Sequence, residues 1–297
     1  MKTHYTIILL AILSLTSCLR LDDQFFNTQT LESYKLDAYE GERELPELPD
    51  TYDVDADKIH LFNLQSDDDG DVQTIYAVYV GDTARIAQDT VIVYCHGNKH
   101  HMDLYWNRAK LLAHVGGKHR YGVLMMDYRG YGMSTGTTTE SGLSADVNTC
   151  MQWLKDHGLT SDRTILYGYS LGSAPASRLS AEPRALTPAK LLLEAPFASA
   201  EVMVQDAALL SLPVSYFTDV RVDNVQWIQS VDQPFCWIHG IDDDFLNIET
   251  HGEEVYNHYH GQYQEAHRVP EAVHNNVPAV MGYEEYVRVV GEFVARD

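Results

Sequence analysis

Short, continuous apolar runs recur along the chain from residue 91 onward. They lack the polar alternation of a half-exposed strand, which predicts strands of a parallel sheet covered on both faces. The runs lie at residues 91–94, 122–126, 164–167, 191–193 and 235–238, and a last strand is expected near 266–269. Apolar positions at helical spacing, between and after these runs, predict helices at residues 104–115, 143–154 and 283–295. This alternation predicts an α/β fold with a mostly parallel central sheet and helices on both faces.

Two further strands are predicted before the first buried run. Residues 59–65 alternate between apolar and polar side chains, residues 74–80 are largely apolar, and the sequence Asp-Asp-Asp-Gly lies between them at 67–70. Asp and Gly tolerate the positive φ of tight turns, so we expect an antiparallel N-terminal hairpin. One α/β domain is therefore expected at residues 57–297, with a small insert at about residues 197–233.

The N-terminus carries the features of an export signal. Lys2 is followed by an apolar run at residues 7–15, which is too short to span a bilayer comfortably. The sequence Leu-Thr-Ser-Cys that ends at Cys18 resembles a bacterial lipobox. The resemblance implies that residues 1–17 are a lipoprotein signal peptide and that Cys18 is acylated. The mature chain would then be a membrane-anchored lipoprotein that faces the periplasm or the cell exterior. A plain signal peptide, or an anchor helix with an incidental cysteine, is the alternative.

The charge of the chain narrows the choice of partners. The formal net charge is −22, from 43 acidic and 21 basic residues, and this excludes nucleic acid, which requires a basic surface. Sixteen acidic residues against three basic ones lie between Asp22 and Asp71. With Pro46 and Pro49 in the same stretch, this composition predicts that residues 18–56 form an acidic tether that is solvated and partly disordered.

A serine flanked by glycines is the strongest chemical signal in the sequence. Gly168-Tyr169-Ser170-Leu171-Gly172 follows a predicted strand and leads into the small residues 173–176, where a helix is expected to begin; this is the arrangement of a nucleophile elbow. Such a turn is tight and strained, and a side chain in place of either glycine would collide with neighbouring backbone. Ser170 would be a weak nucleophile alone, and it requires a base that a third group orients.

Candidates for the base and the acid follow later in the chain. Asp242, Asp243 and Asp244 come directly after the strand predicted at 235–238, and His274 lies in a loop after the last strand. This order of serine, acid and histidine is the one that the elbow arrangement requires. Composition does not separate the three aspartates.

These motifs together resemble the α/β-hydrolase superfamily, and most closely its compact serine-hydrolase branch of esterases, thioesterases and prolyl-oligopeptidase-like relatives. The resemblance covers roughly residues 57–297 and is specific for the fold rather than for the substrate. It rests on His96-Gly97-Asn98, on Asp127-Tyr128-Arg129-Gly130-Tyr131-Gly132, on the segment from Gly168 to Gly172, on His239-Gly240 with Asp243, and on His274.

The resemblance implies a role for each matching residue. Ser170 would be the nucleophile, His274 the general base and Asp243 the orienting acid, with Asp242 and Asp244 as rivals. The backbone N–H groups of Leu171 and Asn98 would form the oxyanion hole, and His239 would be structural. The sequence departs from the family pattern at Lys99, at Val273 and at Phe245-Leu246-Asn247, which leaves the substrate shape and the loop conformation open.

The function predicted from these residues is hydrolysis of a small-molecule carboxylic ester or thioester, without an organic cofactor. A prolyl-oligopeptidase-like peptidase and a non-catalytic binding protein on the same scaffold are the alternatives. Apolar residues of the insert would either line a shallow acyl pocket or cover the sheet; these are Leu209, Leu210, Leu212, Val214, Tyr216 and Phe217.

The sequence predicts no metal site. Cys95, Cys150 and Cys236 form no CxxC pair and are expected to be buried free thiols. A second candidate set for metal binding consists of His96, His100, His101 and Asp103. His96 belongs to the motif that resembles the oxyanion loop, which favours a structural role for it.

Overall fold

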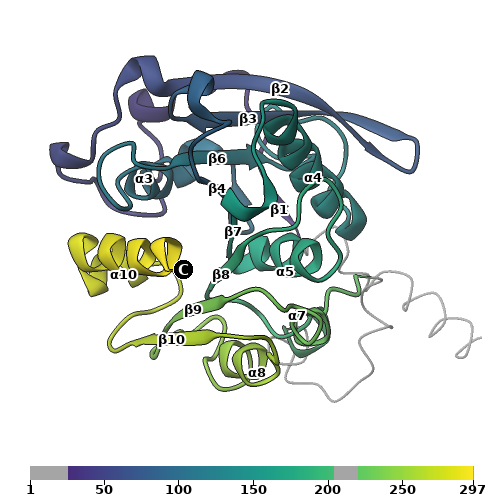
Figure 1. Cartoon of the computed structure of the whole chain (residues 1–297), viewed down its shortest axis with the longest axis vertical. Helices are drawn as coiled ribbons and strands as arrows, with labels where there is room; N and C mark the ends of the chain where they lie inside the picture. Colours follow the sequence, from purple (N-terminus) through teal and green to yellow (C-terminus); the bar gives the residue numbers. More distant parts are fainter. Residues whose placement is uncertain (1–25, 204–219, 297) are drawn as a thin grey trace, which may run out of the picture.

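A twisted eight-stranded sheet runs through the centre of the molecule (Figure 1). The computed structural model describes residues 26–203 and 220–296. The strand order is β10-β9-β8-β7-β4-β6-β3-β2, and all neighbours from β10 to β6 pair in parallel. The strands are β2 (Ile59–Asp68), β3 (Asp71–Val80), β4 (Val91–Cys95), β6 (Gly122–Asp127), β7 (Thr164–Tyr169), β8 (Lys190–Glu194), β9 (Phe235–Gly240) and β10 (Gln264–Val269). The predicted parallel sheet is confirmed.

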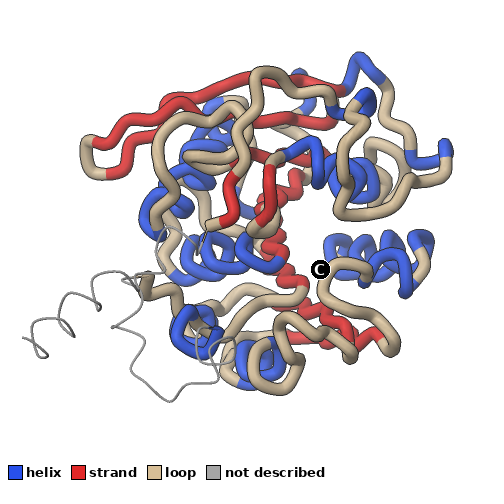
Figure 2. The backbone as a smooth tube through the Cα atoms, turned by 180° about the vertical axis from the view of Figure 1, so that it is seen from behind, coloured by secondary structure: helices blue, strands red, loops and turns tan. Residues whose placement is uncertain are grey.

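Helices cover both faces of this sheet (Figure 2). The helices α3 (Met102–Leu112) and α10 (Tyr283–Ala295) pack on one face. The other face carries α4 (Glu140–Asp156), α5 (Ser173–Ala181), α7 (Asn224–Ile228) and α8 (Gly252–Asn257). The short helix α9 (Val277–Met281) follows β10. Within the described residues, no helix combines the length and the apolar character needed to cross a bilayer.

The central strands show why their sequences lack alternation. All five residues of β4 are buried, with Ile92 and Tyr94 in the core under α3 and α10, and Val91 and Val93 in the core under α4 and α5. A strand that is covered on both faces needs apolar side chains at every position. Cys95, Cys150 and Cys236 are buried free thiols, as expected, and burial raises the pKa of each.

The N-terminal hairpin is longer than predicted. β2 and β3 pair in antiparallel register up to Asp68 and Asp71, so that only Asp69 and Gly70 remain in the turn. Both have positive φ, 53° and 95°, as a two-residue type I′ turn requires. Asp67 and Asp68, two of the three aspartates that mark a loop in the sequence, belong instead to the end of β2.

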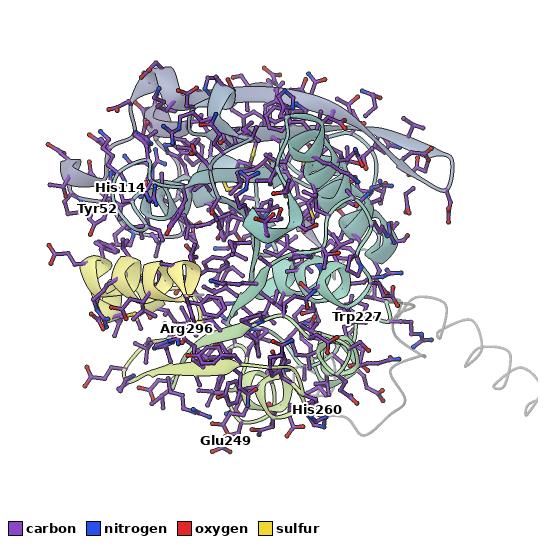
Figure 3. All side chains as sticks on the ribbon, in the orientation of Figure 1. Tyr52, His114, Trp227, Glu249, His260 and Arg296 are labelled. Carbon is purple, nitrogen blue, oxygen red and sulfur yellow. The ribbon has the colours of Figure 1, made fainter. Side chains whose placement is uncertain are left out.

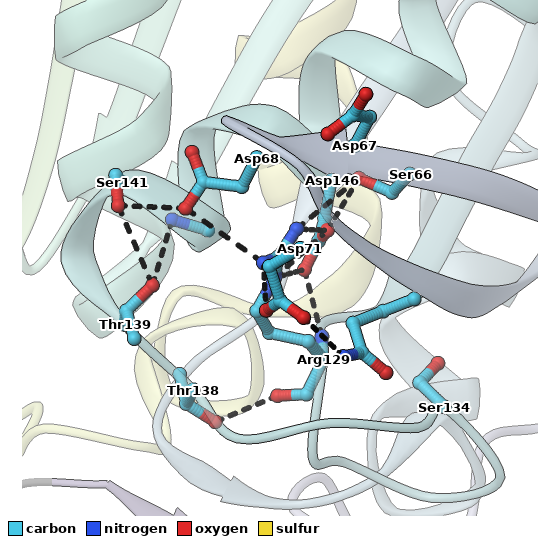
Figure 4. A network of polar contacts seen from close by, with 12 residues as sticks. Ser66, Asp67, Asp68, Asp71, Arg129, Ser134, Thr138, Thr139, Ser141 and Asp146 are labelled. Carbon is cyan, nitrogen blue, oxygen red and sulfur yellow. Dashed lines mark hydrogen bonds and ion pairs between the residues drawn. The ribbon is translucent and has the colours of Figure 1, made fainter.

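A buried arginine ties this hairpin to the rest of the domain (Figure 4). The guanidinium of Arg129, which follows β6, contacts Asp146 of α4 at 2.9 Å and Asp71 at 3.2 Å. Ser66 of β2 donates to the same Asp146 carboxylate at 2.7 Å. Because Arg129 and Asp146 are both fully buried, loss of either would leave an uncompensated buried charge, which costs about 3–5 kcal/mol.

Residues 26–58, here called the N-terminal segment, pack against the domain. This corrects the sequence prediction, because the solvated arm expected up to residue 56 is wrong from residue 26 onward. Leu45, Leu48 and Tyr52 are buried, and the Tyr52 ring meets the His114 ring edge-on at a centroid distance of 5.3 Å (Figure 3). The segment contains β1 (Asn27–Thr28) and the short 3-10 helices η1 (Leu36–Ala38), η2 (Asp50–Tyr52) and η3 (Ala56–Lys58).

Three acidic residues of the N-terminal segment bind specific partners on α3. Asp37 and Asp53 contact Lys110 at 3.1 and 2.7 Å, and Glu44 contacts Arg108 at 2.6 Å. Composition predicted a solvated arm because it counts charges without locating their partners. The apolar residues at 45, 48 and 52 are the signal in the sequence that indicates docking.

Candidate active site

Ser170 lies on a strained turn between β7 and α5. Its φ is 50°, in the left-handed region that residues with a side chain rarely adopt. Two close backbone approaches make the flanking glycines necessary. A Cβ on Gly172 would lie 2.0 Å from the Cys95 carbonyl oxygen, and one on Gly168 would lie 2.5 Å from the Gly172 carbonyl oxygen. The turn is therefore possible only with glycine at both positions.

Two hydrogen bonds connect Ser170 to His274 and His274 to Asp243. Ser170 Oγ lies 2.9 Å from His274 Nε2, and His274 Nδ1 lies 2.9 Å from Asp243 Oδ2. The three residues follow β7, β9 and β10, so the carboxyl ends of the strands bring them to one edge of the sheet, where ligands of such sheets bind. The predicted serine, histidine and acid thus meet in the structure.

The environment of Asp243 distinguishes it from its neighbours. Its carboxylate accepts from His239 Nε2 at 3.1 Å and from the N–H groups of Phe245 and Leu246 at 3.0 and 2.8 Å. Burial acts to raise the pKa of this carboxyl, but the hydrogen bonds from His239 and His274 outweigh it and hold the pKa well below its usual range. The side chains of Asp242 and Asp244 are exposed.

The loop after β4 carries Asn98, one of the two residues predicted for the oxyanion hole. Asn98 Oδ1 accepts from the Tyr131 hydroxyl at 2.6 Å and from the Asn27 N–H at 2.8 Å. β1 also pairs in parallel with the short strand β5 (Lys99–His100), so the N-terminal segment helps to hold this loop. Leu171, the second predicted oxyanion residue, follows Ser170 in the first turn before α5.

A cavity of about 380 Å³ opens over Ser170 and His274. Asn98 and Phe245 line it, as does the N-terminal segment through Asn27, Glu42 and Glu44. These last three residues were missed by sequence reasoning, because the segment was treated as a tether. The apolar residues proposed for the acyl pocket, 209–217, lie outside the residues that the structure describes.

Among the described residues, His96, His100, His101 and Asp103 do not place three ligand atoms close enough together to share an ion. Asp103 accepts from the backbone N–H groups of Lys35 and Leu36, which accounts for its buried carboxylate. Across residues 26–203 and 220–296, one group of three could geometrically hold an ion, and it consists of Cys236, Glu265 and His267. Its carboxylate already accepts from the Tyr263 hydroxyl and pairs with Arg296, which is typical of a hydrogen-bonded cluster.

Comparisons with known proteins agree with the fold. Residues 90–204 match the family model described as the alpha/beta hydrolase fold. The chain is 31% identical over 196 residues to human protein ABHD12B, an alignment that covers 60% of this chain and 52% of the relative. It is 28% identical over 189 residues to lysophosphatidylserine lipase ABHD12 of Xenopus tropicalis, with 56% and 46% covered. The chain thus spans about half the length of these curated relatives.

Solved structures show the same architecture at lower identity. The esterase Pf2001 of Pyrococcus furiosus superimposes with a TM-score of 0.63 at 19% identity, covering 86% of this chain and 97% of the esterase. The esterase EaEST of Exiguobacterium antarcticum gives a TM-score of 0.57 at 17% identity, with 78% and 98% covered. The sheet order, the family match and these superpositions show that the chain is a protein of the α/β-hydrolase fold.

Proposed function

We propose that this protein is a serine hydrolase that cleaves a carboxylic ester or thioester of a small molecule through an acyl-enzyme. The observation that carries the proposal is the pair of 2.9 Å contacts that link Ser170 to His274, both of which line a cavity, and His274 to Asp243. A nucleophile, a base within hydrogen-bond reach and an acid that orients the base are the three parts that acyl transfer requires.

The reaction proceeds in two matching steps. His274 Nε2 takes the Ser170 proton as Oγ bonds to the acyl carbon, and the resulting oxyanion accepts from the N–H groups of Leu171 and Asn98. The bond to the leaving group breaks as His274 returns the proton to the departing alcohol or thiol. Water then attacks the acyl-enzyme by the same route, which releases the acid and restores Ser170. Asp243 holds the imidazole in the required orientation and compensates its transient positive charge.

The named relatives support hydrolysis as the reaction class. One is called a lysophosphatidylserine lipase and two structural neighbours are called esterases. These names describe the relatives, and the substrate of this chain is part of the proposal. Lys99 and Phe245, where the sequence departs from the family pattern, line the cavity. They are the residues expected to determine which substrate fits.

Covalent labelling tests the proposal directly. A fluorophosphonate should label the folded protein on Ser170, and a panel of short- and medium-chain esters, thioesters and peptides should show turnover of esters or thioesters. Peptide cleavage without ester cleavage would favour the peptidase alternative. A folded protein that neither labels nor turns over any ester would indicate a binding protein instead.

We also propose that the protein is exported and anchored by a lipid on Cys18. Cys18 and the signal peptide at residues 1–17 lie outside the described residues, and the support for the anchor is the lipobox-like sequence. Cys18→Ala should move the protein from the membrane fraction to the soluble fraction in its native type of host. Cys150→Ala, which changes a buried thiol of α4, is the matched control and should leave the fractionation unchanged. Retention of the Cys18→Ala protein in the membrane would contradict the anchor.

A further inference from the structure

A buried ionic cluster lies directly behind the candidate active site. Arg108 of α3 is 2% exposed, and its guanidinium contacts two carboxylates. Its Nε and Nη2 donate to both oxygens of Glu44 at 2.6 and 2.8 Å, and its Nη1 donates to both oxygens of Glu194 at 2.9 Å. Burial opposes the positive charge, but the two carboxylates raise the pKa of Arg108 well above its usual value. Arg108 is therefore a fixed cation that makes four hydrogen bonds to carboxylate oxygens.

The cluster joins three parts of the fold that are distant in sequence. Glu44 belongs to the N-terminal segment, Arg108 to α3, and Glu194 ends β8. The hydroxyl groups of Tyr167 and Tyr286 also bond to Glu194, so its carboxylate is held from β7 and from α10. Since every member has a partner, the guanidinium plane has one orientation.

That plane rests on the residue that precedes the serine. Arg108 Cζ lies 4.0 Å from the centre of the Tyr169 ring, within the range of a cation–π contact. The Tyr169 ring is stacked near the His274 ring, with centroids 5.6 Å apart and an interplanar angle of 30°. Its hydroxyl donates to the His274 carbonyl oxygen at 3.2 Å. Tyr169 is thus bonded in sequence to Ser170 and in space to His274.

We propose that Arg108 is a positioning residue for the Ser170–His274 pair. It acts through Tyr169 and is itself oriented by Glu44, so the N-terminal segment is a working part of the active site rather than a tether. The inference rests on the proposed function, because its readout is turnover. The physical reason is that the hydrogen bond from Ser170 to His274 tolerates little displacement, and an error of about 1 Å in such a contact can cost a hundredfold in rate.

A planar guanidinium suits this role and an ammonium does not. Arginine binds two carboxylates with a rigid fork and stacks on an aromatic ring at the same time, whereas lysine carries a point charge on a flexible stem. Arg108→Lys therefore keeps the charge but removes the plane that packs on Tyr169. Glu44→Gln keeps the shape of the side chain and removes one of the two carboxylates.

The experiment separates positioning from stability. Arg108→Lys should lower kcat for a short-chain ester about tenfold or more, with KM changed by less than about twofold. Glu44→Gln should also lower kcat, by a smaller factor than Arg108→Lys. Tyr169→Phe removes the hydroxyl that binds the His274 carbonyl. In the double variant with Arg108→Lys, the factor by which kcat falls should be smaller than the product of the factors for the two single variants.

Arg129→Lys is the matched control. Arg129 is equally buried and also binds two carboxylates, but its contacts are with Asp71 and Asp146 and not with residues of the cavity (Figure 4). It should lower Tm while leaving kcat per folded molecule unchanged.

Each result decides the inference. A fall in kcat per folded molecule for Arg108→Lys, or for Glu44→Gln if the first variant does not fold, supports it when Arg129→Lys shows no such fall. A lower Tm with unchanged kcat in both variants would overturn it and leave Arg108 a structural residue. Absence of turnover of every ester and thioester by the unaltered protein would overturn the proposed function and this inference with it, whereas unchanged kcat in both Arg108→Lys and Glu44→Gln would overturn this inference alone.

Discussion

Replacement of Ser170 by alanine should lower kcat for a short-chain p-nitrophenyl ester about a millionfold, to a residual rate about 10³–10⁴-fold above that in water alone. The variant loses only Oγ, the atom 2.9 Å from His274 Nε2, and keeps the backbone turn. Because the hydroxyl that is removed lines a cavity and no close packing is lost with it, Tm should change little. Steady-state kinetics and thermal unfolding on the same preparation measure both effects.

Ser177 provides the matched control for this variant. It is a buried serine of α5, seven residues further along the chain, and it does not line the cavity. Ser177→Ala should retain turnover and fluorophosphonate labelling. Undiminished hydrolysis by Ser170→Ala would refute the assignment of the nucleophile.

Replacement of Asp243 by asparagine should lower kcat about ten-thousandfold. An asparagine side chain of nearly the same shape cannot supply the negative charge that compensates a protonated imidazole. Its amide can also donate toward His274 Nδ1, which would favour the wrong tautomer of the base. Kinetics of the variant with a short-chain ester give the factor.

Two neighbouring aspartates test this assignment within the same loop. Asp242→Asn and Asp244→Asn remove one charge each from exposed side chains. Asp244 also lines the cavity, so its variant can change KM, but both variants should keep kcat within a few-fold of the unaltered protein. A large loss of kcat in either variant, together with a small loss in Asp243→Asn, would move the acid to that position.

The low pKa of Asp243 determines how its contributions to activity and to stability depend on pH. Its pKa is depressed in the folded state by hydrogen bonds from His239 and His274, so the carboxylate stays ionised from neutral pH down to moderately acidic pH. Titration of Asp243 itself should therefore add no step to the pH profile of kcat between about pH 5 and 8. A depressed folded-state pKa also stabilises the fold above the unfolded value of about 3.9, and this contribution is lost as the pH falls through the folded value.

The N-terminal segment limits the distance between the proposed anchor and the cavity. Asn27, Glu42 and Glu44 line the cavity, and Cys18 lies nine residues before Asn27. Nine residues reach at most about 30 Å when fully extended. If Cys18 carries the proposed lipid, the opening of the cavity would stay within that distance of the anchoring surface.

Local patterns along the chain determined the elements and their order. Continuous apolar runs predicted β4, β6, β7, β8 and β9, because a strand covered on both faces requires apolar side chains throughout. The final helix was predicted at residues 283–295, where it is found. Gly168 and Gly172 around Ser170 predicted the tight turn, because backbone sterics at a strand-to-helix turn act over only a few residues.

Contacts between distant residues decided the rest. Three consecutive aspartates are equivalent in composition, and only the fold buries Asp243 beside His274, 31 residues later in the chain. The acidic N-terminal segment resembles a solvated arm until Glu44 is paired with Arg108, 64 residues away. A charge is solvated or buried according to the partners that the folded chain brings to it, and that information is absent from any local stretch of sequence.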